Sequence, residues 1–153
     1  MQTAAAQSDP IRDEFHRLMN GLLFSLLSWK QLTDFWAKLD GSAGWYLYAV
    51  GEAVPASPAT AEQVGKFITE IDTLLRHDHR ENYCGIVFAD NLDNPTFVKI
   101  YDPNHLGSSC GSSKHPPPLP GWIMSQIPPP ELHLKYALPA NRKRWWQGLF
   151  SQD

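Results

Sequence analysis

Cys110 and two nearby histidines are the residues whose types most directly suggest catalysis. Cys110 lies between a serine and a glycine in the Gly/Ser-rich segment 107–114. Glycine lets a substrate approach closely, and backbone amides in such a loop can lower the pKa of a thiol or bind an oxyanion. His105 and His115 are near enough along the chain to act as the base. Because a catalytic cysteine and histidine meet in the fold, this spacing does not establish a dyad, and a thiol without a catalytic role is the alternative interpretation.

The segment 107–114 has the composition of a phosphate-binding loop but not its spacing. A P-loop places four residues between its two glycines and continues into a helix that Lys-Ser or Lys-Thr opens. Here only three residues separate Gly107 from Gly111, and the prolines that begin at Pro116 prevent a helix. We therefore expect no nucleotide binding at this loop and interpret it as a flexible connection.

Six residues are of types that bind transition metals. They are His77, His79, Cys84, His105, Cys110 and His115. Their spacing matches no standard zinc site, because the chain contains neither C-x-x-C nor H-E-x-x-H. The first two lie at the end of a predicted helix, whose dipole favours protonated imidazole, and the first cysteine falls in a predicted strand as a small hydrophobe. A metal site stays an alternative, and the cofactor is unknown.

A proline-rich segment suggests recognition by a partner protein. Eight of the 13 prolines lie between His115 and Ala140. The part from His115 to Trp122 has the composition of a polyproline II helix, which aromatic grooves of other proteins bind. The alternative is a rigid arm that packs over the protein's own aromatic residues. The candidate contact residues are Pro117, Leu119, Pro120 and Trp122.

The C-terminal tail, residues 141–153, combines three consecutive cations with large apolar side chains. Such a tail can dock into a partner's groove or make weak peripheral contact with an anionic membrane. Docking onto the protein's own core or onto a second copy is the alternative. The candidate partner-binding residues here are Arg142, Trp145, Trp146 and Phe150.

The remaining patterns predict the elements that position these residues. A helix begins at Asp9-Pro10 with apolar spacing to Leu39, either continuous or broken near Ser25 or Ser28. A capping box, Thr60 and Gln63, opens a second helix. The predicted strands are 45–50, an antiparallel hairpin of 83–89 and 96–101, a short edge strand at 122–127 and a further one at 132–138. This order predicts an α+β fold with an antiparallel or mixed sheet of about 4–5 strands and helices on one face.

Length and charge predict one domain and limit the classes of partner. A single α+β domain is expected over 9–140, with the proline-rich segment at 115–139, a flexible N-terminus at 1–8 and the tail at 141–153. Residues 1–103 are net acidic and 104–153 net basic, a balance that does not favour nucleic acid as a partner. Two cysteines, with neither a signal peptide nor a transmembrane segment, predict a cytoplasmic protein without a Cys84–Cys110 disulfide.

These patterns together predict a small accessory or interaction protein. It would bind another protein, or a second copy of itself, through the proline-rich segment or the C-terminal aromatics. The alternative is a thiol- or metal-dependent enzyme, or a metal-binding protein, centred on Cys110 and the nearby histidines. An exposed apolar patch would favour the first interpretation, and a pocket that unites Cys110 with two or more histidines or carboxylates would favour the second.

Overall fold

The computed structural model describes residues 9–104, 119–132 and 140–150. In these ranges the chain forms four helices and five strands. In chain order they are α1 (Pro10–Asn20), β1 (Phe24–Ser25), α2 (Trp29–Lys38), β2 (Tyr46–Ala49), α3 (Ala61–Asp78), β3 (Val87–Ala89), β4 (Phe97–Ile100), β5 (Trp122–Ser125) and α4 (Ala140–Leu149). The predicted α+β class is confirmed.

All five strands belong to one antiparallel sheet with the order β1-β3-β4-β5-β2. The predicted hairpin is confirmed as β3 and β4. The prediction that 122–127 is an edge strand is wrong, because β5 pairs with β4 on one side and β2 on the other. Pro120 and Pro128 flank β5 instead of interrupting it, so its backbone donors stay free to pair on both sides.

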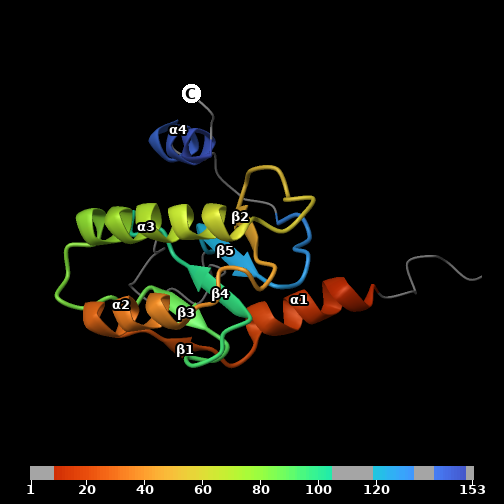
Figure 1. The fold of residues 1–153 in the computed structure, drawn as a ribbon, viewed down its shortest axis with the longest axis horizontal. Helices are drawn as coiled ribbons and strands as arrows, with labels where there is room; N and C mark the ends of the chain where they lie inside the picture. Colours follow the sequence, from red (N-terminus) through yellow and green to blue (C-terminus); the bar gives the residue numbers. More distant parts are fainter. Residues whose placement is uncertain (1–8, 105–118, 133–139, 151–153) are drawn as a thin grey trace, which may run out of the picture.

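The main core lies on one face of the sheet, between the strands and the helices α2 and α3. The buried stripe of α3 includes Phe67 and Ile71, which share one apolar cluster with Leu47, Ile86 and Val98 of the sheet region. The predicted packing of this helix is therefore confirmed. Figure 1 shows α3 lying above the strands, with α4 above α3.

Helices cover both faces of the sheet, and not one face as predicted. Side chains alternate along β4, so Phe97 points away from the main core. It packs instead against Phe15 of α1, with ring centroids 5.4 Å apart, in a second cluster that includes Met19 and Ile123. In Figure 1, α1 lies on the side of the sheet opposite α3.

A short strand interrupts the apolar pattern that runs from Pro10 to Leu39. The chain leaves the helical conformation after Asn20 and forms β1, which pairs with β3. Ser28 then caps α2 by accepting a hydrogen bond from the Gln31 N–H at 2.9 Å. The break predicted near Ser25 or Ser28 is therefore the correct alternative, although the periodicity did not reveal the strand. A strand pairs non-locally, and its signal here is only two residues long.

The capping box predicted for α3 is present with both of its hydrogen bonds. The Thr60 hydroxyl accepts from the Gln63 N–H at 3.1 Å, and the Gln63 side chain accepts from the Thr60 N–H at 2.9 Å. The helix continues beyond Leu75 to Asp78, and His79 follows as its C-cap. The end of α3 thereby delivers two polar residues, Asp78 and His79, to the neighbourhood of β4.

The C-terminal tail forms α4, which packs against α3 and the end of the sheet. The rings of Trp145 and Trp122 pack in a T-shaped arrangement with centroids 5.6 Å apart, and those of Trp146 and Phe67 do so at 6.2 Å. Leu149 is buried in the main core. No helix within the described ranges is long and apolar enough to cross a membrane. Most of the strand predicted at 132–138 lies outside the described residues.

Candidate functional site

A pocket of about 690 Å³ opens on the part of the sheet face that α1 leaves uncovered. Its walls come from three places: the turn after α1, the loop between α3 and β3, and the strands β3 and β4. We call it the Lys99 groove. Its described lining residues are 21–23, His79, Tyr83, Gly85, Ile86, Phe88, Lys99 and Tyr101.

Lys99 is the cation of the groove, and it projects from β4 on the same face as Phe97. Its ammonium donates a hydrogen bond to the backbone carbonyl of Met19 in the last turn of α1 at 3.0 Å. It also lies over the rings of Phe88 and Tyr101, 6.0 and 5.6 Å from their centroids. Burial among these groups lowers the pKa of Lys99. None of the ion pairs within the described ranges involves this lysine.

His79 is the second polar group of the groove. Its ring lies between the rings of Trp29 and Tyr83, with centroids 6.0 Å from each, and the residue is only 8% exposed. The Nε2 atom is buried and has no hydrogen-bond partner among the described residues. A buried polar atom without a partner costs free energy, so this nitrogen would gain from a ligand that supplies one.

Two glycines shape the walls of the groove. A Cβ at Gly21 would lie 2.7 Å from the carbonyl oxygen of Arg17, so a larger residue there would displace the end of α1. Gly85 has a φ of +71°, a conformation that side chains rarely adopt, and a Cβ there would contact the Tyr83 ring at 3.1 Å. The turn that brings Leu22 to the groove and the loop that carries Tyr83 therefore both depend on glycine.

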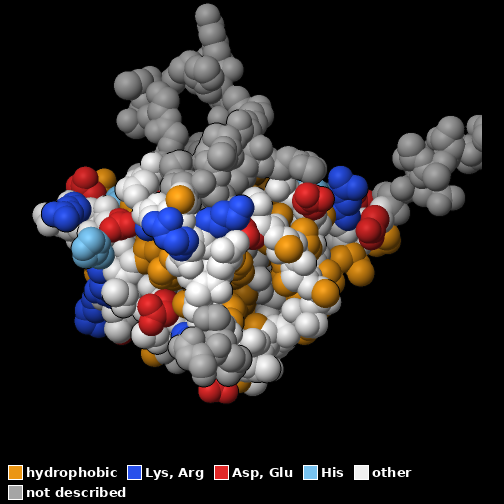
Figure 2. Space-filling model, turned by 90° about the horizontal axis from the view of Figure 1, so that it is seen from above, with side chains coloured by type: hydrophobic (Ala, Val, Ile, Leu, Met, Phe, Trp, Pro, Cys, Tyr) orange, Lys and Arg blue, Asp and Glu red, His pale blue; other side chains and the backbone are white. Residues whose placement is uncertain are grey.

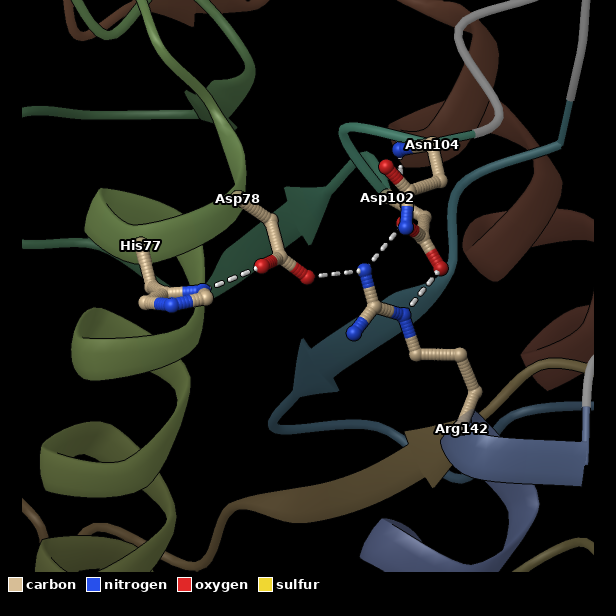
Figure 3. A network of polar contacts seen from close by, with 5 residues as sticks. All are labelled: His77, Asp78, Asp102, Asn104 and Arg142. Atoms are coloured by element: carbon tan, nitrogen blue, oxygen red, sulfur yellow. Dashed lines mark hydrogen bonds and ion pairs between the residues drawn. The ribbon is translucent and has the colours of Figure 1, made fainter.

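A second polar cluster joins α4 to the body of the protein (Figure 3). Arg142 donates from Nε and Nη2 to the two carboxylate oxygens of Asp102, at 2.9 and 3.0 Å, and from Nη2 to Asp78 at 2.7 Å. Its side chain is 8% exposed. Hydrogen bonds from His77 and Arg142 lower the pKa of Asp78. Because each polar partner is another residue of the chain, this cluster holds elements together and leaves little room for a ligand.

The structure does not bring the metal-ligand candidates in its described ranges together. His77 is exposed and hydrogen-bonded to Asp78, whereas His79 is enclosed by aromatic rings in the groove. Cys84 is a buried free thiol whose pKa burial raises. Among the residues described, no group of three His, Cys, Asp or Glu side chains could hold a metal ion. His105, Cys110 and His115 lie outside the described residues.

Of the candidate partner-binding residues, those in the described ranges contact the chain itself. Pro120 and Trp122 are buried and Leu119 is half-buried, while Pro117 lies outside the described residues. Arg142 is held by the two aspartates described above. The half-buried aromatics of α4 and of the residue after it pack on the main core; these are Trp145, Trp146 and Phe150.

Exposed cations remain on the outer side of α4. Lys143 and Arg144 are exposed, next to the half-buried tryptophans of the same helix. Figure 2, which views the molecule from the α4 side, shows Lys and Arg side chains interspersed with hydrophobic ones on this face. The tail thus keeps its basic character while its largest apolar side chains pack inward.

Sequence reasoning missed the Lys99 groove. The signal for it in the sequence is the alternation that puts Lys99 and Tyr101 on one face of a strand, while the sequence around His79 suggests a metal ligand or an imidazole at a helix end. Its walls come from segments that lie far apart along the chain. Comparisons with protein-family models, with curated proteins and with solved structures find no match to this chain, so its function has to be argued from this geometry alone.

Proposed function

We propose that the protein is a binding module that receives an apolar segment of a partner protein in the Lys99 groove. The observation that carries this proposal is an aromatic-walled groove whose rim leaves large apolar side chains in water. Leu22 is 83% exposed and Tyr83 is 54% exposed, although both line the groove. Contiguous exposed apolar surface of this kind is typical of interaction sites.

A protein segment fits this rim better than a small molecule does. The volume of the groove falls in the range of small-ligand pockets, about 300–1,000 Å³. A small ligand held inside would nevertheless leave Leu22 and much of Tyr83 in water. An extended chain that passes over the rim would cover both. Two further exposed apolar residues, Phe24 and Leu27, lie in and just after the edge strand β1, so the same chain could continue along this edge.

The proposal keeps the class of function that the sequence suggested, binding of another protein, and assigns it to a different site on the protein. Binding through the proline-rich segment or the tail remains a hypothesis, but the described aromatics of the tail are already packed against the protein's own core. The alternative centre around Cys110 involves residues outside the described ranges and stays a prediction. The cytoplasmic location expected from the sequence is likewise kept as a part of the proposal.

A phage-displayed library of random peptides, selected on the wild-type protein, tests the groove. Peptides that are enriched should bind the wild type saturably and should lose at least about tenfold in affinity when Leu22 is replaced by Arg, since a buried charge would replace an apolar contact. Ile11→Arg is the matched control, because Ile11 is also an exposed aliphatic residue, in the first turn of α1, but does not line the groove. Selection of no specific peptide, or of peptides that bind Leu22→Arg as tightly as the wild type, would refute the proposal.

A further inference from the structure

The charges in and around the groove indicate what chemistry its occupant carries. Among the described residues that line it, none is acidic, whereas Lys99 is cationic. The ammonium of Lys99 has three donors, and among the described residues a single backbone carbonyl, that of Met19, accepts from it. Two N–H groups therefore stay available at a half-buried position beside aromatic rings.

Capping of α1 accounts for only part of this arrangement. A cation near the C-terminus of a helix is stabilised by the helix dipole, and the bond to Met19 satisfies one terminal carbonyl. It does not neutralise the charge. Arg142 shows what the same fold does with another buried cation, since two carboxylates, Asp78 and Asp102, surround that guanidinium. Lys99 has no such carboxylate among the described residues.

From these contacts we infer that the apolar partner segment also carries an acidic group and places its carboxylate against the ammonium of Lys99. This inference rests on the proposed function. A carboxylate accepts charge-assisted hydrogen bonds from the two available N–H groups, and these are strong in a partly dry site. The neighbouring rings of Phe88 and Tyr101 provide the surface for an apolar side chain next to that carboxylate.

The surface beyond His79 also favours an acidic partner segment. His79 also lines a second pocket, of about 500 Å³, together with Trp29, Arg76, Arg80 and other residues of the α3 end. Arg76 is paired with Asp72, while Arg80 is exposed and forms none of the ion pairs within the described ranges. Glu81 lines this pocket as well and offsets part of the positive charge. A segment that leaves the groove across His79 thus meets a further exposed cation, Arg80.

Synthetic versions of the selected peptides test the inference. Each acidic residue is replaced in turn by its amide, and each peptide is made with a free and with an amidated C-terminus. One of these carboxylates should prove necessary, with a loss of at least about tenfold in affinity, or about 1.4 kcal/mol, when it is neutralised. Lys99→Met should cause a similar loss, Lys99→Arg should retain most of the binding, and neutralising the peptide should cost nothing further in Lys99→Met.

The controls separate this inference from the proposal on which it rests. Lys66→Met removes the same charge from an exposed position of α3 outside the groove and should leave affinity unchanged. If peptides bind the groove but no carboxylate matters, or Lys99→Met binds as well as the wild type, the inference is wrong and the proposed function stands. If the Leu22→Arg test fails, both are wrong. If Lys99→Met does not fold, the affinities of the acid-to-amide peptides for the wild-type protein still test the inference.

Discussion

Removal of the Arg142 guanidinium is the sharpest test of how α4 is attached to the protein. We consider Arg142→Met, which keeps an unbranched apolar stem and deletes the charge. In the native protein the side chain is 8% exposed and contacts Asp102, itself 10% exposed, and the more accessible Asp78 (Figure 3). The substitution therefore leaves a nearly buried carboxylate at the end of β4.

The size of the effect follows from what remains around Asp102. Without Arg142, the hydrogen bond that Asp102 retains among the described residues is the one from the Asn104 N–H at 2.9 Å. Breaking a buried ion pair by removing one partner costs about 3–5 kcal/mol. Because Asp78 retains contact with water and with His77, we expect a loss near the lower end, about 3 kcal/mol of the free energy of unfolding. That is a large fraction of the about 5–15 kcal/mol typical of a domain.

Urea unfolding followed by tryptophan fluorescence measures this loss. The reporter is well placed, because Trp145 of α4 contacts Trp122 of β5. Lys143→Met is the matched control: it removes the same charge from the neighbouring exposed position and should change stability by no more than about 0.5 kcal/mol. Asp102→Asn completes a double-mutant cycle with Arg142→Met, and the two substitutions should be strongly non-additive.

Two results would refute this reasoning. One is an Arg142→Met protein within about 1 kcal/mol of the wild type, which would mean that the ion pair does not repay the burial of its charges. The other is simple additivity of Arg142→Met and Asp102→Asn, which would mean that the two side chains do not interact in solution.

Two further predictions concern the core and acid stability. Ile71→Ala should lower the free energy of unfolding by about 2–5 kcal/mol, because Ile71 is fully buried in the main core. Ile11→Ala, at a position that is half exposed, should cost far less, and equal losses would contradict the core assignment. Hydrogen bonds from His77 and Arg142 lower the pKa of Asp78, so its stabilisation is complete above the ordinary Asp pKa of about 3.9 and is lost as pH falls through the lowered value. Urea midpoints measured down to about pH 2 should show a smaller acid loss in Asp78→Asn, and an unchanged loss would count against this role.

Local signals in the sequence were sufficient for the helix starts. The Asp9-Pro10 cap and the capping box of Thr60 and Gln63 act within a few residues, so their pattern predicts their hydrogen bonds directly. The hairpin of β3 and β4 was also predictable, because turn formers join two apolar segments that are neighbours along the chain.

The candidate site was predictable only in fragments. Alternation along β4 placed Lys99 and Tyr101 on one face, but not what covers that face. α1 packs on Phe97 and ends beside Lys99. This placement leaves the rest of that sheet face uncovered, and the groove lies there. The length of α1 and the docking of the 79–86 loop decide the groove together, and neither is visible in the spacing of β4.

Thus the sequence by itself determined the α+β class, the caps, the hairpin and the apolar stripe of α3, because these depend on neighbours a few residues away. Tertiary structure alone decided that β5 enters the sheet between β4 and β2, where its backbone pairs with strands distant in the chain. It also turned Arg142 from a tail cation into the partner of two aspartates, 40 and 64 residues away. Among the described residues, the cation Lys99 is left without a carboxylate while the cation Arg142 is held by two, because burial and charge pairing depend on which distant segments meet.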